Sequence, residues 1–384
     1  MLLQKGLPLI SASSQNHYAP VGKWLFGTAG MVVGMIHIGC LTRLTQSGLS
    51  MTTWTPLGSL PPITHDEWQE EFRRYKEFPE WQQRKSMTLD EFKFIYGWEY
   101  GHRMLGRCVG LIFALPWVYF TARGMIPKGY QPRMFGLLAM GASQGLVGWW
   151  MVKSGLGDDR RGDSKEIRVR PTRLAAHLSM AVATYGALLW TGWDVFGITH
   201  KNFVENAQQL GKDGIRQASR LRIGSIHFTG LAAVTIVSGA LVAGNDAGRA
   251  FNTFPLMDDK WIPADILELQ PWQRNLTENT ATVQWNHRVL GITTAVSAIG
   301  LAGVGLRRPS AITPQVRRGL YAAGIAATGQ VTLGIVTLLN YVPISLAAAH
   351  QLGSIAVFTS GLYLVHSLRY ARPAIIRSLQ QIAK

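Results

Sequence analysis

Residues 99–106 read Glu-Tyr-Gly-His-Arg-Met-Leu-Gly, and residues 284–291 read Gln-Trp-Asn-His-Arg-Val-Leu-Gly. Both stretches contain the pattern His-Arg-x-Leu-Gly, with the two histidines at His102 and His287. A motif that recurs within one chain indicates an internal repeat, and a repeat largely decides the architecture because both halves must form the same unit.

The correspondence extends over most of the chain. Its other members are Ala175-Ala176-His177 with Ala348-Ala349-His350, Gln144 and Gly148 with Gln330 and Gly334, and Gly39, Leu41, Gly48 and Pro56 with Gly239, Leu241, Gly248 and Pro255. Along the chain the offset between partners is about 200, then 185, 186 and 173 residues, and it changes only where a loop can absorb the difference. The first half therefore has the same elements as the second, joined by longer loops.

Apolar blocks long enough to cross a bilayer account for these elements, since a spanning helix needs about 20 residues. The eight blocks are residues 24–41, 95–120, 134–152, 174–193, 223–242, 283–306, 320–339 and 342–365. Buried helices of a soluble protein are disfavoured because the blocks have almost no polar face. The sequence predicts an all-α polytopic membrane protein, with eight transmembrane helices in two pseudo-symmetric four-helix bundles related by an axis along the membrane normal.

The domain boundaries follow from this division. We expect an N-terminal segment (1–21), a first bundle (22–200) with a structured outer loop (44–94), a linker on the inner side (201–221), a second bundle (222–369) and a basic tail (370–384). Thr64-His65-Asp66-Glu67 and Thr88-Leu89-Asp90-Glu91 have the capping-box pattern, so each predicts a helix start within the outer loop. This loop should form a small cap over the outer mouth of the first bundle.

The net charge of +16 orients the chain rather than recruiting nucleic acid. Basic residues gather in the connections between blocks two and three, four and five, and six and seven, and in the tail, whereas the loop between blocks five and six is acidic. The loop between blocks three and four is an exception whose charges offset one another. This pattern places both termini on the inner side of the membrane.

Two other features carry less information. Cys40 and Cys108, the two cysteines, both lie in apolar blocks, so they cannot form a loop disulfide or a thiolate metal site. The first 20 residues contain one lysine and no arginine, which is atypical of a targeting presequence.

Four histidines lie in the repeat, each near the outer start of an even-numbered apolar block: His102, His177, His287 and His350. An ionisable residue within a membrane helix is a functional hypothesis by default. A single such histidine would more often be an interhelical hydrogen-bonding residue, but a pair in each bundle indicates metal ligands. No cysteine, aspartate or third histidine recurs with them, so zinc lacks ligands and the two axial positions of a haem iron suit the pairs better.

The halves differ beside these ligands. Glu99 precedes His102 by three residues and therefore shares its helix face, whereas the equivalent residue of the second half is Gln284. A carboxylate beside one site alone suggests one reactive and one passive site. The alternative is a glutamate that lies in water at the interface.

The sequence resembles haem A synthase, of the mitochondrial type and the related proteobacterial forms, from about Gly22 to Arg369. The resemblance rests on Thr-Arg-Leu-Thr-Gln-Ser-Gly-Leu-Ser at 42–50, Leu-Asp-Glu-Phe-Lys-Phe-Ile at 89–95, Gly-Trp-Trp-Met-Val-Lys-Ser-Gly-Leu at 148–156 and the four histidine motifs. It implies oxidation of the C8 methyl of haem O, by two hydroxylations and a dehydration, to the formyl group of haem A for cytochrome c oxidase. The lack of a loop cysteine pair agrees with the mitochondrial type.

By the family's motif, His102 and His177 flank the substrate haem, His287 and His350 hold the iron of a resident haem B, and Glu99 is the required carboxylate. Arg103, Arg288 and Arg43 are candidate propionate or site partners. Gln46 and Asn286 depart from the pattern, which has glutamate and aspartate there. This puts an acid or base role at position 46 in doubt and leaves the haem ligand itself in place.

The resemblance also implies partners and a location. We expect an external electron donor, with a ferredoxin as a candidate, together with haem O synthase, oxidase assembly factors and the lipid bilayer, and no nucleic acid; a homo-oligomer stays open. The expected location is the mitochondrial inner membrane with both termini in the matrix, or alternatively a bacterial inner membrane with cytoplasmic termini.

A haem iron with two histidine ligands has no open position for oxygen, so either one imidazole moves away or water supplies the oxygen. The residues also leave three rival functions open. These are a dihaem cytochrome that relays electrons, a transporter whose histidines relay protons, and a scaffold for oxidase assembly. The unmatched Glu99 argues against a pure relay, and a haem spectrum would exclude the transporter.

Overall fold

The computed structural model describes residues 15–157, 166–197, 210–308 and 312–372. In these ranges the secondary structure is helical apart from one isolated bridge between Met257 and Lys260, which confirms the all-α prediction. Residues 1–14 of the expected N-terminal segment, 201–209 of the linker and the tail from 373 lie outside the described residues.

Eight long helices follow the predicted blocks. They are α1 (Gln15–Leu44), α3 (Leu89–Ala122), α4 (Gln131–Leu156), α5 (Pro171–Phe196), α7 (Gly211–Gly244), α9 (Thr280–Leu306), α10 (Pro314–Leu339) and α11 (Ile344–Ser367). All of these except α11 are long and apolar enough to cross a membrane, so the described part of the chain contains seven such helices. The passage of α11 through the membrane stays a prediction.

The start of α11 differs from the last predicted block. Tyr341 and Val342 both have a φ of 59°, in the left-handed region, and Pro343 precedes the first helical residue. Two consecutive left-handed residues cannot continue a right-handed helix. Val342 and Pro343 therefore precede the helix, which begins at Ile344, two residues after the predicted start of the block.

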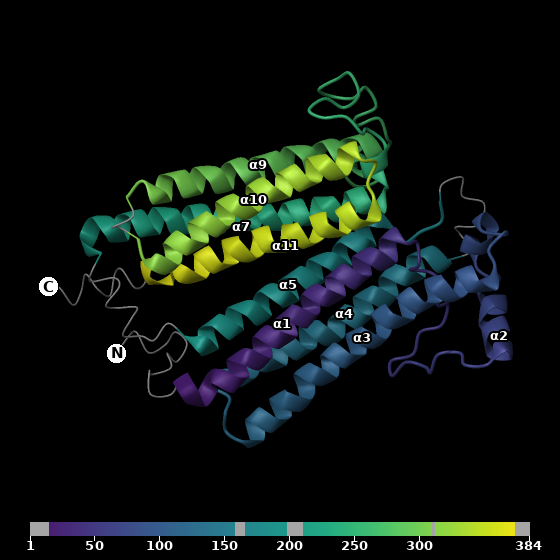
Figure 1. Ribbon diagram of the computed structural model, residues 1–384, viewed down its shortest axis with the longest axis horizontal. Coiled ribbons are helices and arrows are strands. Elements are labelled where there is room, and N and C mark those ends of the chain that lie inside the picture. Colours follow the sequence, from purple (N-terminus) through teal and green to yellow (C-terminus); the bar gives the residue numbers. More distant parts are fainter. Residues whose placement is uncertain (1–14, 158–165, 198–209, 309–311, 373–384) are drawn as a thin grey trace.

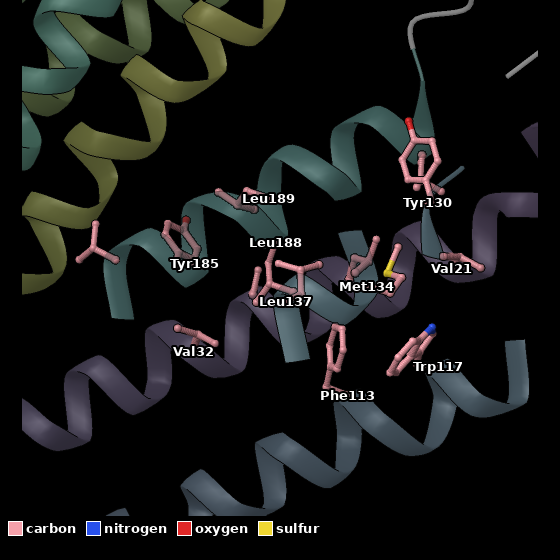
Figure 2. Close-up of a cluster of buried hydrophobic side chains, with 14 of the residues drawn as sticks. Val21, Val32, Phe113, Trp117, Tyr130, Met134, Leu137, Tyr185, Leu188 and Leu189 are labelled. Carbon is pink, nitrogen blue, oxygen red and sulfur yellow. The ribbon is translucent and has the colours of Figure 1, made fainter. Parts of the chain in front are cut away.

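The long helices form two groups of four that lie side by side (Figure 1). Helices α1, α3, α4 and α5 pack together, as do α7, α9, α10 and α11, while α5 contacts α7 and α1 contacts α11 between the groups. One buried cluster, shown in Figure 2, contains residues of all four helices of the first group and extends to Ile236 of α7 and to Ile355 and Phe358 of α11. A second cluster lies within the second group. Large apolar side chains such as Leu115 remain exposed on the outside, where lipid tails would surround them.

The cap at one end of the first group is a folded unit. Both capping boxes are present, and they begin α2 (His65–Tyr75) and α3 as the sequence predicts. Phe72 and Tyr75 of α2 are buried against Phe92 and Tyr96 at the start of α3, with the rings of Phe72 and Phe92 stacked 5.0 Å apart. The short helix η3 (Pro79–Gln83) completes the unit.

The opposite end of the molecule has a buried cluster of charges. Asp194, near the end of α5, accepts hydrogen bonds from Arg133 of α4 at 2.7 Å, from His366 of α11 at 3.1 Å and from Arg369 of η8 (Arg369–Ala371). The carboxylate thus joins the two groups of helices at the end far from the cap.

Candidate functional site

Each histidine of the repeat faces a glycine on the neighbouring helix. A Cβ atom on the glycine would lie 3.0 Å from the ring for Gly39 and His102, 3.0 Å for Gly148 and His177, 3.1 Å for Gly239 and His287, and 2.7 Å for Gly334 and His350. Three of the four distances are to Cε1, and that of His102 is to Nε2. These glycines are the ones that recur in the sequence, so their recurrence was a signal for close contact with the imidazoles that the sequence reasoning did not use.

The second-half histidines face one another across their group of helices. The rings of His287 (α9) and His350 (α11) have centroids 6.3 Å apart and planes 85° apart. Two nitrogen–metal bonds of about 2 Å each, with half a ring beyond each nitrogen, span about 6 Å between centroids. The pair therefore fits one metal ion between two imidazoles. For His102 and His177, the described part of the chain records no comparable ring contact.

The ring nitrogens of the four histidines differ in their hydrogen bonds. His287 Nδ1 hydrogen-bonds to Ser238 Oγ at 2.7 Å. In contrast, the Nδ1 atoms of His177 and His350 are buried and have no hydrogen-bond partner within the described ranges. A buried ring nitrogen without a partner is costly and requires an explanation, of which a bound group is one.

Two glutamines of the repeat hold the second histidine of each pair at its backbone. Gln144 of α4 donates to the carbonyl oxygen of His177 at 2.9 Å, and Gln330 of α10 donates to that of His350 at 2.8 Å. The sequence reasoning matched these glutamines but gave them no role. They tie neighbouring helices together at the residues that carry the imidazoles.

Glu99 is buried and fully engaged. Its Oε2 accepts from Ser50 Oγ at 2.6 Å and from the backbone N–H of Met51 at 2.8 Å, and its Oε1 pairs with Arg103 at 2.6 Å. It is therefore not a glutamate in water at the interface, because 3 % of its surface is exposed. It fastens the segment after α1 to the helix that carries His102.

The second half makes the same connection without a charge. Gln284 donates to the carbonyl oxygens of Ala247 and Phe251, at 2.8 and 3.3 Å. The position equivalent to Glu99 thus holds the equivalent segment in both halves. What distinguishes the first half is the negative charge beside its histidine.

The three candidate propionate partners all bind backbone carbonyls. Arg103 donates to Met51 and Thr53, at 2.9 and 2.8 Å. Arg288 donates to Phe251 and Leu256, at 2.8 and 3.0 Å. Arg43 reaches the other half, where it donates to Ala243 at 2.6 Å and lies 3.6 Å from Asp246.

Residues 51–59 run along α3, and we call this segment the strap. Besides Arg103, Tyr100 donates to Ser59 at 3.2 Å and Arg107 donates to Thr55 and Pro56, at 2.8 and 3.1 Å. Polar side chains at 100, 103 and 107 lie on one helix face, a signal that the sequence reasoning missed. The second half has Ile292 in the place of Arg107, so this deeper attachment belongs to the first half alone.

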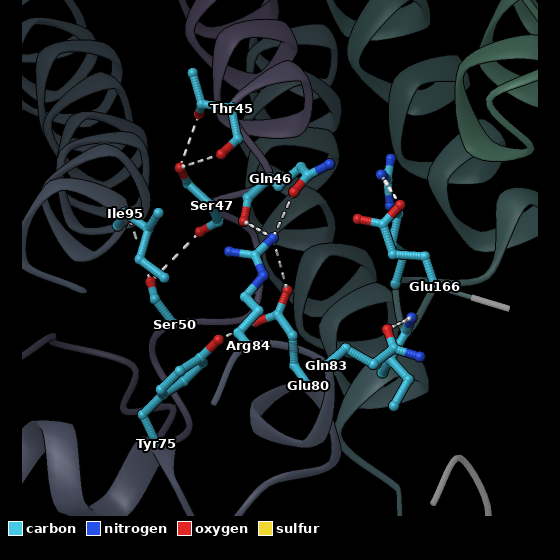
Figure 3. Close-up of polar contacts among 12 residues, drawn as sticks. Thr45, Gln46, Ser47, Ser50, Tyr75, Glu80, Gln83, Arg84, Ile95 and Glu166 are labelled. Carbon is cyan, nitrogen blue, oxygen red and sulfur yellow. Dashed lines mark hydrogen bonds and ion pairs between the residues drawn. The ribbon is translucent and has the colours of Figure 1, made fainter. Parts of the chain in front are cut away.

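Gln46, one of the two residues that depart from the family's pattern, contacts the cap (Figure 3). Arg84 donates to its Oε1 at 2.8 Å and lies 3.5 Å from the buried carboxylate of Glu80. Burial raises the pKa of Glu80 to about 7, against the opposing effect of Arg84. Asn286, the other departure, lines a cavity of about 350 Å³ between α7 and α9 and has no recorded bond to His287 within the described residues.

In the described part of the chain no cluster of three or more histidine, cysteine or acidic residues could bind a metal ion. The fold is that of a multi-pass helical membrane protein, and each of its two groups of helices carries two of the four repeat histidines.

Comparison with known proteins agrees with this class. Residues 22–362 match the model of the COX15-CtaA family, described as cytochrome oxidase assembly protein, and the chain belongs to this family. It is 44% identical to "Heme A synthase COX15" of Arabidopsis thaliana, over 99% of this chain and 81% of that protein. It is 38% identical to "Heme A synthase" of Nitrosospira multiformis, over 91% and 94%. It is also 37% identical to the "Heme A synthase-mitochondrial ferredoxin fusion protein" of Schizosaccharomyces pombe, over 91% and 60%.

Proposed function

We propose that this chain is a haem A synthase, an oxidoreductase that converts the C8 methyl of haem O to the formyl group of haem A. The observation that carries the proposal is the recurrence of a glycine-backed histidine pair in both halves, with a buried carboxylate beside one pair only. In this proposal His102 and His177 flank the substrate haem O, and His287 and His350 hold a resident haem B.

The chain's own residues would prepare the first site in three ways. Gly39 and Gly148 leave space in which the imidazoles can lie against their neighbouring helices. Arg103 and Arg107 hold the strap against α3, beside the helix face that carries His102. Glu99 supplies a charged carboxylate one turn from His102, where it can hold a proton or position a water or the substrate near the methyl group.

The resident haem B would supply one-electron chemistry when bound. His287 and His350 would be its axial ligands, with Ser238 and Gln330 bonded to them from α7 and α10. The two sites lie in adjacent groups of helices that contact one another through α5 and α7. This arrangement supports an electron relay from the second group to the first.

The wider setting is part of the proposal. We expect all eight long helices, including α11, to span the mitochondrial inner membrane with both termini in the matrix; a bacterial inner membrane is the alternative. The fused ferredoxin of the relative from Schizosaccharomyces pombe supports a ferredoxin as electron donor. Haem O synthase would provide the substrate, and oxidase assembly factors would receive the product.

The experiment that tests the assignment is haem extraction with mass analysis on the purified wild type, His102→Ala and His287→Ala. We expect His287→Ala to lose haem B, and His102→Ala to retain it while haem O and haem A binding is disturbed. A dihaem relay cytochrome, the second candidate, predicts instead that both variants lose haem B alike and that the wild type carries no haem O or haem A. Loss of the same haem from both variants would refute the assignment of haem O to the first pair of histidines and haem B to the second.

Glu99→Gln tests the carboxylate separately. Glutamine can still accept from Met51, and Gln284 shows that an amide holds the equivalent segment, so the fold and the haem B content should be unchanged. We expect haem A output to fall at least tenfold, since a general acid or base typically contributes at least that much. Normal haem A output, measured by extraction from cells that supply haem O, would contradict a role for this carboxylate in the chemistry.

A further inference from the structure

Ser238 Oγ lies within hydrogen-bond distance of both His287 and the backbone of its own helix. Ser238 is 8 % exposed, and its hydroxyl donates to the carbonyl oxygen of Thr235 at 2.8 Å. A hydroxyl has one hydrogen, so when it is directed to this carbonyl the serine oxygen accepts from His287. In this arrangement the 2.7 Å contact is a bond from Nδ1–H of His287 to Ser238 Oγ.

A bond in this direction selects one tautomer of the imidazole. When Nδ1 of a neutral imidazole bears the proton, Nε2 carries the free lone pair that binds a metal. Residues that accept from the second nitrogen of a ligand histidine fix the ring's orientation and make it a more basic ligand. Ser238 is such an acceptor for Nδ1 of His287.

Thr235, one turn before Ser238, makes further polar contacts with α9. Thr235, whose carbonyl accepts from Ser238, has its hydroxyl 2.8 Å from that of Thr294 on α9. A second contact, from Thr235 to the carbonyl of Leu290, measures 3.4 Å. Helices α7 and α9 are thus joined at Thr235, one turn before Ser238, and at Thr294, two turns after His287.

The first half has none of these polar groups. By the offsets of the repeat, Ile38 stands in the place of Ser238, Met35 in that of Thr235 and Val109 in that of Thr294. His102, the counterpart of His287, makes no recorded hydrogen bond through its ring within the described ranges. The restraint on the imidazole is therefore confined to the half in which we place the resident cofactor.

We propose that Ser238 is a positioning residue that fixes the tautomer and orientation of His287 as a permanent haem ligand and sets the reduction potential of that haem. This inference rests on the proposed function, since it takes His287 to be a ligand of resident haem B. The lack of a counterpart leaves His102 free to turn away from its haem, as a ligand of a substrate must.

The test compares Ser238→Ala, Ser238→Thr and a matched control, Ser225→Ala, in the purified full-length protein. Ser225 is a buried serine of the same helix that donates to the backbone of Leu221, and its side chain has no recorded hydrogen bond to a histidine in the described structure. The measurements are the midpoint potential of haem B by spectroelectrochemistry and the rate at which haem B transfers to excess apomyoglobin. Neither readout depends on synthesis of haem A.

Ser238→Ala should raise the midpoint potential, because a less basic imidazole stabilises ferric iron less. A tenfold loss of preference for the ferric state corresponds to 59 mV for a one-electron couple. Haem transfer should be about tenfold faster, since loss of such a partner typically costs 10- to 100-fold in affinity. Ser238→Thr, which keeps the hydroxyl, and Ser225→Ala should both resemble the wild type.

Two results would overturn the inference. One is a potential and a transfer rate for Ser238→Ala that equal those of Ser225→Ala. The other is a Ser238→Thr variant as impaired as Ser238→Ala, because the serine would then matter for its size and not for its hydroxyl. Retention of haem B by His287→Ala is a different failure, which would remove the proposed function itself.

Discussion

The four glycines that face the histidines show how a single hydrogen atom in place of a side chain determines a site. Each lies on a helix next to that of its histidine, and a methyl group there would approach the imidazole to 3.1 Å or less. Non-bonded carbon atoms prefer about 3.5–4.0 Å. Any larger residue must therefore move the ring, and the ring is the part of the site that would bind a metal.

Among the four glycines, we expect substitution of Gly334 by alanine to have the largest effect. Its Cβ would lie 2.7 Å from Cε1 of His350, which should displace the imidazole and cost about 1–3 kcal/mol of overpacking. We expect the purified variant to contain less than half of the wild-type haem B, measured by the absorbance of the reduced haem per protein.

Gly329→Ala on the same helix is the control. A Cβ at Gly329 meets nothing within 4 Å, so this variant should keep its haem and gain slightly in helix propensity. Equal haem contents in the two variants would mean that the glycine at 334 does not serve the histidine.

Among the elements, the cap shows most clearly how local sequence becomes structure. Two capping boxes start α2 and α3, and aromatic side chains from both helices then form a buried cluster. Glu80 contacts this cluster through Tyr75, from which it accepts a hydrogen bond at 3.0 Å, and it also pairs with Arg84. Because Arg84 also binds Gln46, these contacts connect the cap to the end of α1.

The stability of the cap should depend on pH through Glu80. Its pKa rises from an ordinary 4.5 to about 7 on folding, so between these values the folded state binds more protons than the unfolded state. Stability must then fall as the pH rises from about 4.5 to about 7, and level off above. We expect amide hydrogen exchange of residues 65–87, corrected for intrinsic rates, to show less protection at pH 7.5 than at pH 5.

Glu80→Gln should remove this dependence, because an amide does not titrate in that window. Glu77→Gln, on a largely exposed side chain of the same unit, is the matched control and should leave the dependence in place. A protection profile of Glu80→Gln that still falls between pH 5 and pH 7.5 would show that another group is responsible.

For the whole molecule, contacts between charged side chains join the two groups of helices at both ends. Asp194 connects α5 to α11 and η8 at one end, and Arg43 and Arg168 reach Asp246 at the other, at 3.6 and 2.8 Å. Lipid tails are as apolar as the helices, so membrane helices associate through close packing and interhelical polar contacts and not through the hydrophobic effect.

Asp194→Ala should therefore lower the stability of the whole protein. It leaves the guanidinium groups of Arg133 and Arg369 without their shared carboxylate, and breaking a buried ion pair in this way typically costs about 3–5 kcal/mol. We expect a lower thermal unfolding midpoint in detergent, followed by tryptophan fluorescence. Asp213→Ala, at an exposed position near the start of α7, should leave the midpoint unchanged.

An unfolding midpoint of Asp194→Ala equal to that of Asp213→Ala would mean that the cluster contributes nothing between the groups. A two-step transition in Asp194→Ala would instead show that the groups unfold separately once this connection is lost.

The sequence by itself determined the long helices, the two starts of the cap helices, the repeat and the residues of the two histidine pairs. These features depend on local patterns, namely runs of apolar residues, capping boxes and a repeated motif, and the chain carries them whatever its tertiary contacts are. The family followed from the same motifs.

Only the tertiary structure decided which groups the polar side chains meet. Arg103 and Arg288 were candidates for propionates, yet they bind carbonyls of segments that fold back from as far as 52 residues away. Glu99 fastens the segment after α1, and Ser238 reaches across to His287 from another helix. A helix pattern predicts the face on which a side chain lies, but its partner depends on the path of a loop or on the packing of a second helix, which local sequence does not encode.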